Sequence, residues 1–302
     1  MKRIINIISL LVLSAGLYGQ SLPFLNISSD PYSYSMGGNT LTLEPTAYSV
    51  TSNASAMALS ENVLSASATY MAWQPNVLNN QMLGVAGYYR ADKLAVGISG
   101  KYYTHTPYDI TDDNGYVSGM FTPVEMSADV AVAYRLFGGL SVGANVRYIT
   151  SSMTETNAGN AVSADISVSY KLKNIKVAVA VTNIGSEVDY GYGPYKLPSM
   201  AKAGAGYTHS INKNNSVSIH VEGDYLLNKS AFMAAVGAEY SFKKLLSLRV
   251  GYHYGDNNSI PSYASAGLGI NILGINVSGA YVLGFNNSPI NGSYMLSLGY
   301  SF

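Results

Sequence analysis

Two histidines have serine residues close by, and this pairing is the one that nucleophilic catalysis uses. His220 follows Ser218, and His253 follows Ser247 at a longer interval. A hydrolase needs a histidine, a serine and an orienting polar group that converge in space. Serine is frequent throughout this chain, so its presence beside a histidine carries little information. We assign no catalytic residue and expect a protein that is not an enzyme.

An acidic run, Asp112-Asp113-Asn114-Gly115, offers the oxygen ligands that Ca²⁺ prefers. It lacks the spaced ligands and the closing glutamate of a calcium-binding loop, so a β-turn is the better interpretation. The chain contains no cysteine, which excludes thiolate metal sites and disulfide bonds. We therefore assign neither a metal nor a cofactor to the protein.

Charged residues also stand at alternate positions of apolar segments. In 124–135 every second residue from Val124 is apolar or aromatic, whereas Glu125, Asp129 and Arg135 fall in the other set. A period of two places these sets on opposite faces of a strand. In a membrane barrel the apolar face contacts lipid and the charged face lines the lumen. Because both signs are interspersed, we predict a polar lumen network rather than an ion-selective ring; its members are Glu125, Asp129, Arg135, Arg147, Glu222 and Arg249.

The elements that position these charges are strands of about ten residues. The expected strands are 64–73, 81–90, 93–103, 123–135, 140–150, 161–171, 175–183, 201–210, 215–225, 231–241, 246–254, 263–272, 275–283 and 294–302. Their number is even, as closed bacterial barrels require. The sequence therefore predicts an all-β fold, a 14-stranded antiparallel transmembrane β-barrel.

The composition agrees with a chain that is partly solvated by lipid. Charged residues make up only 11% of the chain, less than half of the usual share of about 25%. The 17 basic and 17 acidic residues cancel, so nothing indicates binding to nucleic acid. Many of the 26 tyrosines stand at strand ends, where two interfacial girdles would lie.

Short and long connections alternate between the strands. Short turns and longer loops of this kind mark the periplasmic and outer ends of a barrel. The loops 104–122 and 184–200 are rich in aromatic residues, which suit protein contact because rigid rings bury area at low entropic cost. The outer-loop residues that we expect to contact partners are Tyr108, Tyr116, Phe121, Tyr190, Tyr192 and Tyr195.

The N-terminal part differs from the barrel. Residues 1–19 have the charged, apolar and small-residue layout of a signal peptide for export. Residues 20–63 contain no full alternating strand, and 53–61 is expected to form a short helix. A barrel of this width needs a filled lumen, so we predict that 20–63 is an inward-folded plug and that 64–302 is the barrel.

Several short motifs then suggest a family. They are Phe24-Leu25-Asn26, Ser35-Met36-Gly37-Gly38-Asn39, Thr182-Asn183-Ile184-Gly185, Leu197-Pro198 and Gly237-Ala238-Glu239-Tyr240. With the plug and the strand count, they resemble the PorV/PorQ family of Bacteroidetes outer-membrane proteins, within the FadL-like barrel superfamily.

The resemblance implies a non-enzymatic accessory subunit of a protein-handling machine in the outer membrane, such as type IX secretion, where it would accept cargo or tether surface proteins. A subunit of the barrel-assembly complex and a FadL-like transporter of hydrophobic solutes remain as alternatives. The expected partners are outer-membrane lipid or lipopolysaccharide and other protein subunits of an envelope complex, which would contact the outer loops.

Overall fold

The computed structural model describes residues 22–112, 114, 116–191, 193–256 and 259–302. The predicted signal peptide, 1–19, and the first two residues of the predicted plug lie outside the described residues. Within the described ranges, no helix has both the length and the apolar character that crossing a membrane requires.

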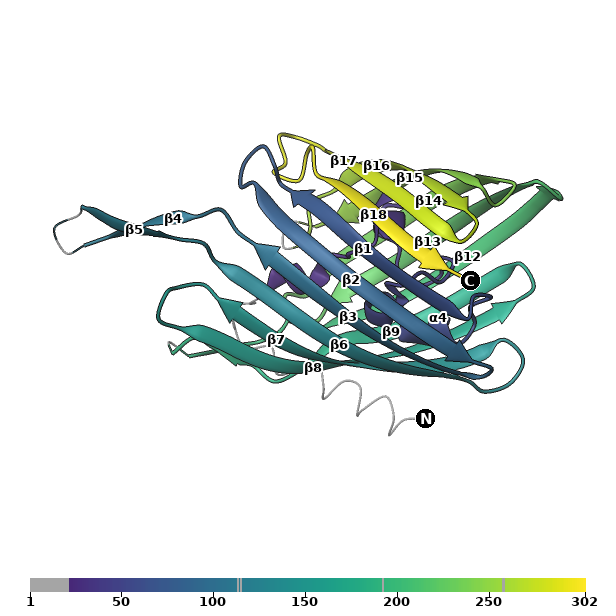
Figure 1. The fold of residues 1–302 in the computed structure, drawn as a ribbon, viewed down its shortest axis with the longest axis horizontal. Coiled ribbons are helices and arrows are strands. Elements are labelled where there is room, and N and C mark those ends of the chain that lie inside the picture. The colour runs from purple at the N-terminus through teal and green to yellow at the C-terminus, as the bar shows by residue number, and fades with distance from the viewer. Residues whose placement is uncertain (1–21, 113, 115, 192, 257–258) are drawn as a thin grey trace.

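The described residues form a closed barrel of 14 antiparallel strands (Figure 1). These are β1 Leu64–Trp73, β2 Asn80–Ala91, β3 Leu94–Thr104, β6 Val124–Arg135, β7 Leu140–Ser152, β8 Ala158–Leu172, β9 Ile175–Gly185, β12 Met200–Asn212, β13 Asn215–Leu226, β14 Ala231–Phe242, β15 Leu246–Gly255, β16 Tyr263–Ile272, β17 Ile275–Gly284 and β18 Tyr294–Ser301. The barrel closes where β1 pairs with β18, with Met71 opposite Met295. The predicted fold class is confirmed, and every predicted strand is present.

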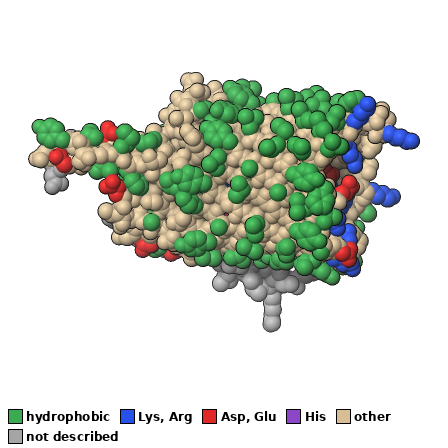
Figure 2. Space-filling model, in the orientation of Figure 1, with side chains coloured by type: hydrophobic (Ala, Val, Ile, Leu, Met, Phe, Trp, Pro, Cys, Tyr) green, Lys and Arg blue, Asp and Glu red, His purple; other side chains and the backbone are tan. Residues whose placement is uncertain are grey.

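The two faces of the barrel wall follow the alternation in the sequence. On β6, Val130 is 64% exposed on the outside, whereas its neighbour Asp129 is 3% exposed on the inside. On the face that Figure 2 shows, hydrophobic side chains are spread across the outer wall. Tyrosines on this outer face lie toward both ends of the strands, for example Tyr134 near one end and Tyr148 near the other. Such a surface is that of a barrel surrounded by lipid.

Residues 22–63 lie inside the barrel (Figure 1). Their helices are η1 Pro23–Asn26, α2 Pro31–Ser35, α3 Ser49–Ser52 and α4 Ala54–Met57. Asp30 caps α2, because its carboxylate accepts a 2.9 Å hydrogen bond from the Tyr32 backbone N–H. Of the helix expected at 53–61, only Ala54–Met57 is helical, as α4; α3 ends before it, because Asn53 between them has a non-helical backbone.

The Met36-Gly37-Gly38 turn of the plug packs directly on the backbone of the barrel wall. Gly37 has φ +74°, and a Cβ atom there would lie 2.5 Å from the Tyr252 carbonyl oxygen. On the wall, a Cβ at Gly251 would lie 2.0 Å from the Gly37 nitrogen. Glycine on both sides is therefore what allows the plug and the wall to approach this closely.

The two ends of the barrel differ in their connections. At the long-loop end, β4 Tyr108–Thr111 and β5 Val117–Phe121 form a hairpin that extends well beyond the wall (Figure 1). A second small pair, β10 Val188–Asp189 and β11 Pro194–Tyr195, lies within the 186–199 loop. At the other end, which we call the short-turn end, the strands are joined by a few residues each.

Candidate functional site

Arg147 lies at the centre of a polar cluster on the lumen wall. Its guanidinium contacts the Asp129 carboxylate at 2.6 Å and the Asp165 carboxylate at 3.1 Å, which ties β7 to both neighbouring strands. It also donates to Oδ1 of Asn183 at 2.5 Å, and the Asn183 amide reaches Asn26 of the plug at 3.2 Å. The charged groups are buried, so each relies on the others for hydrogen-bond partners.

A β-bulge brings Asn183 into this cluster. The register between β8 and β9 shifts between Ala164 and Ile166, and Asn183 has φ +56°. Its backbone N–H donates to Oδ1 of Asp165 at 2.6 Å. Asparagine tolerates the left-handed conformation, and bulges redirect side chains. The sequence motif around Asn183 was visible, but its place in the cluster depends on this local geometry.

A second cluster joins the wall to the plug. The Glu222 carboxylate accepts hydrogen bonds from the backbone N–H groups of Thr40 at 2.7 Å and Leu41 at 2.8 Å, and from the Thr40 hydroxyl at 2.6 Å. Lys202 contacts Glu222 at 2.9 Å and Asp224 at 3.6 Å. A buried carboxylate that accepts two backbone N–H bonds fixes the position of the plug segment.

Arg249 forms a third contact with the plug. It pairs with Glu239 at 2.6 Å, and its Cζ atom lies 4.0 Å from the ring centre of Tyr32 in α2. Arg135, which we predicted to belong to the lumen network, lies elsewhere. It pairs at 3.2 Å with the exposed Asp92 at the short-turn end. The predicted network is thus divided among three clusters that contact the plug, a separate site around Glu125 and one rim pair.

The histidines that suggested catalysis both contact the plug. His220 Nδ1 lies 2.9 Å from the Thr42 hydroxyl, and His253 Nδ1 lies 3.2 Å from the Gly37 carbonyl oxygen. Each therefore supports the position of the plug. Within the part of the chain that the structure describes, no group of three or more His, Asp or Glu side chains could hold a metal ion.

Two carboxylates of the plug have shifted pKa values. Burial raises the pKa of Asp30, and its hydrogen bonds to Thr46 and Tyr32 offset this only in part. Burial also raises the pKa of Glu44, but its basic neighbours, chiefly Lys176 at 2.6 Å, together lower it by more, so this pKa lies below its usual value. The Glu44 carboxylate therefore favours its charged form beside Lys176.

Glu125 links the lumen to the long loops. Its carboxylate is fully buried and lies 2.9 Å from His105 Nε2, at the base of the β4–β5 hairpin. Ser151 donates to the same carboxylate at 3.4 Å and accepts a 2.9 Å hydrogen bond from the Tyr190 hydroxyl. One buried carboxylate thus connects the hairpin with the 186–199 loop.

The β4–β5 hairpin presents an apolar surface to solvent. Tyr116 is 74% exposed and Met120 is 69% exposed, and Val117 is also largely exposed. The Tyr108 ring packs on Phe121 with the ring centres 5.7 Å apart, and its hydroxyl donates to the Met153 carbonyl oxygen. We call the side chains of Tyr108, Tyr116, Val117 and Met120 the hairpin surface.

The tyrosines of the other loop lie differently. Tyr190 and Tyr195 are half-buried, with ring centres 6.2 Å apart, and pack on the cluster that includes Phe24 of the plug. They cover the plug from the long-loop end. Tyr192 lies outside the described residues.

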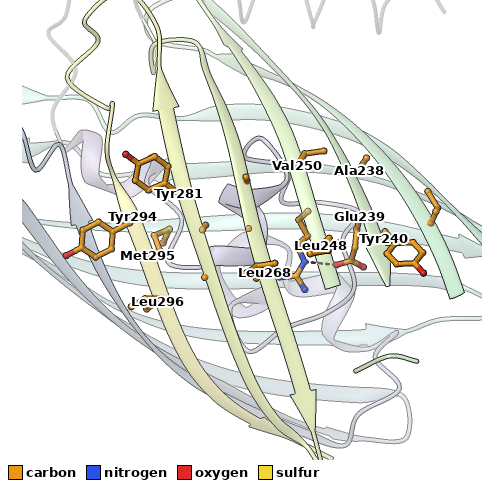
Figure 3. Close-up of a pocket in the computed structure, with 16 residues that line it drawn as sticks. Ala238, Glu239, Tyr240, Leu248, Val250, Leu268, Tyr281, Tyr294, Met295 and Leu296 are labelled. Carbon is orange, nitrogen blue, oxygen red and sulfur yellow. Dashed lines mark hydrogen bonds and ion pairs between the residues drawn. The ribbon is translucent and has the colours of Figure 1, made fainter. Parts of the chain in front are cut away.

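A groove of about 730 Å³ lies on the outer wall over β14–β18 (Figure 3). Its small outward residues are Ala238, Ala266 and Gly279, and larger ones such as Leu248 and Tyr294 flank them. The side chains that project into it are those that face lipid. The Glu239–Arg249 pair lies on the lumen side of the same strands, because Arg249 packs on Tyr32 of the plug.

The comparisons with known proteins agree with this geometry. The family model described as type IX secretion system protein PorV matches residues 17–231. No curated protein matches the chain.

Solved structures share the fold at low identity. The toluene transporter TbuX of Ralstonia pickettii is 13% identical with a TM-score of 0.62, over 90% of this chain and 97% of that one. The P. putida toluene transporter TodX is 12% identical with a TM-score of 0.64, over 89% and 97%. A Pseudomonas aeruginosa FadL homologue is 11% identical with a TM-score of 0.53, over 91% and 98%. At such identity the likeness concerns the fold alone.

Proposed function

Because the chain belongs to the PorV family of type IX secretion proteins, we propose that it is an accessory subunit of a protein-handling machine in the outer membrane. In this role it binds cargo or surface-anchored proteins through its long-loop end. It performs no catalysis, and its signal peptide directs its export.

The hairpin surface is the observation that carries this proposal. Tyr116, Val117 and Met120 are large apolar side chains exposed to solvent on a hairpin that extends past the wall. Aromatic residues and methionine are enriched at the cores of protein interfaces, and tyrosine is among the residues that contribute most of their binding energy. The buried link through Glu125 and His105 holds the hairpin base against the barrel, which limits the entropy that binding would cost.

The plug supports a role at the surface rather than in conduction. Three polar clusters, centred on Arg147, Glu222 and Arg249, tie residues 22–41 to the wall. A passage through the lumen would require these buried groups to lose their partners, which is costly. We therefore place the binding activity on the loops.

The transporter alternative has a specific observation in its favour, namely the shared fold with the toluene transporters TbuX and TodX. The barrel-assembly alternative shares the loop surface with our proposal and differs from it in the identity of the partner. Both are separable by experiment.

The test is to purify the full-length protein from its native membrane in mild detergent and to identify the polypeptides that accompany it. The double variant Tyr116→Ser/Met120→Ser removes apolar side chains from the hairpin surface. Its matched control, Leu227→Ser/Phe285→Ser, removes two exposed apolar side chains from other connections at the long-loop end.

We expect secretion cargo or envelope proteins to accompany the wild type and the control, and the hairpin variant to lose them. Equal recovery with both variants would refute the role of the hairpin. Recovery of the barrel-assembly complex would favour that alternative, and a barrel purified alone would contradict both.

A further inference from the structure

Although the net charge is zero, basic and acidic side chains are concentrated at opposite ends of the barrel. Figure 2 shows Lys and Arg side chains gathered at the short-turn end, whereas acidic side chains occur on the projecting hairpin. The described acidic residues of the long loops are Asp109, Asp112, Glu155, Glu187, Asp189 and Asp256, against Lys196 and Lys229. The cations of the short-turn end are Arg90, Lys93, Arg135, Lys171, Lys173, Lys176, Lys213, Lys243 and Lys244.

We call the cations of the short-turn end the basic rim. Only some of them have an acidic partner. The acidic residues at the same end are Glu44, Glu61 and Asp92, and they pair with Lys176, Lys244 and Arg135 respectively. Among the residues that the structure describes, no carboxylate lies within ion-pair distance of Lys93, Lys173, Lys213 or Lys243. These four lysines are exposed.

Three rim lysines occupy backbone conformations that disfavour lysine. Lys173 has φ +52°, and Lys243 and Lys244 both have φ +55°. Glycine and asparagine adopt this left-handed region more readily, and they are the usual residues of tight hairpin turns. Local folding preference therefore does not explain lysine at these turns, which points to a function of the charge.

Apolar side chains at the same end of the barrel place the rim at a membrane surface. Leu273 is 93% exposed at the tip of the β16–β17 turn, and Phe137 is 70% exposed at the β6–β7 turn. Lys243 lies over the Phe242 ring, with its Nζ atom 5.2 Å from the ring centre. Side chains with an apolar part and a cationic end are those that settle between acyl chains and headgroups.

We propose that the short-turn rim binds anionic phospholipid headgroups of the inner leaflet of the outer membrane. Cations occur at five of the six short turns, those of β2–β3, β6–β7, β8–β9, β12–β13 and β14–β15. A leaflet surrounds the whole barrel, so it requires cations distributed around the perimeter, whereas one protein partner would need a single patch. The rim fixes the depth and the orientation of the barrel, because the acidic long-loop end is repelled by the same headgroups.

The test measures headgroup selection by the full-length protein in a maltoside detergent. Dioleoylphosphatidylglycerol and dioleoylphosphatidylcholine, which have identical acyl chains, are added in equal amounts, and retained lipids are counted by native mass spectrometry. The rim variant is Lys173→Asn/Lys243→Asn, and the matched control at the other end is Lys196→Asn/Lys229→Asn.

We expect the wild type and the control to retain the anionic lipid preferentially, and the rim variant to lose on the order of tenfold of this preference at low ionic strength. The rim variant should unfold at the same or a higher temperature, because asparagine suits its turns. This result separates lipid binding from a structural role of the lysines. Equal retention of both lipids by the wild type, or an equal loss in the control, would overturn the proposal. Recovery of an acidic periplasmic polypeptide in place of lipid would also overturn it.

Discussion

The Glu222 carboxylate on β13 and the Thr40 backbone N–H of the plug are hydrogen-bonded at 2.7 Å, although 182 residues separate them in the chain. Because Glu222 also pairs with Lys202, it anchors this part of the plug. We expect Glu222→Gln to leave Lys202 without its main partner and to weaken plug docking by about 3–5 kcal/mol, as removal of one partner of a buried pair does.

Hydrogen exchange measures this effect, since amides of residues 36–45 should exchange faster in Glu222→Gln while the barrel strands stay protected. The same chemical change at the exposed Glu187 of a long loop is the control and should leave the exchange of the plug unaltered. Unchanged exchange at 36–45 in Glu222→Gln would show that other contacts alone hold the plug.

Because the outer wall faces lipid, the cost of placing a charge on it should depend on the depth of that position in the membrane. Val130 lies in the middle of β6 and Tyr134 lies near its end, and both face outward. Val130→Arg should destabilise the inserted barrel by about 2–4 kcal/mol, whereas Tyr134→Arg should cost about 0–1 kcal/mol because its charge reaches the interface. Urea titration in lipid vesicles measures both. Equal costs would mean that β6 does not cross the membrane as assigned.

Most of the fold is predictable from the sequence because membrane strands need a strict period of two. A lipid-facing position such as Val130 and a lumen position such as Asp129 cannot be exchanged without exposing charge to lipid. This constraint repeats on every strand, so the strand ends in the structure agree closely with the expected ranges. Within the expected loop 104–122, the alternation of Tyr108 and Ile110 ahead of the Asn114-Gly115 pair is a hairpin signal in the sequence, although we assigned no strands there.

The groupings of side chains were less predictable. Alternation predicts the face of the strand on which Arg135 lies. It does not predict its position along the barrel axis, which places Arg135 at the short-turn end beside Asp92. The contacts of Glu222 with Thr40 depend on how the plug folds, and no periodicity encodes that fold. The balanced net charge likewise concealed the basic rim, which becomes visible only when the lysines are assigned to turns.

The orientation of the barrel can be tested directly, because the chain has no native cysteine. We expect Asn114→Cys in the hairpin to react with a membrane-impermeant maleimide on intact cells. Lys173→Cys in a short turn should react only after the cells are opened. The reverse pattern would mean that the barrel has the opposite orientation in the membrane, and it would contradict the assignment of the basic rim to the inner leaflet.

The pair formed by Glu44 and Lys176 predicts a pH dependence at the short-turn end of the plug. The pKa of Glu44 is lower in the docked plug than its ordinary value of 4.5. Its contribution to docking is therefore complete above pH 4.5 and is lost as the pH falls through the lower, docked value. A nitroxide at Leu59→Cys, beside Lys176 in one crevice, should gain mobility only in that acidic range. In Glu44→Gln its mobility should not respond to this change of pH.

The choice between partner binding and solute transport rests on what occupies the lumen. A hydrophobic solute needs a continuous apolar path, whereas the Glu222 and Arg147 clusters place buried charges between the plug and the wall. The groove over β14–β18 lies on the lipid-facing side and is separated from these clusters by the strands themselves. We therefore expect native mass spectrometry of the purified protein to show bound polypeptides and no stoichiometric fatty acid. A lone barrel with one bound fatty acid, retained in Tyr116→Ser/Met120→Ser, would establish the transporter in place of the secretion subunit.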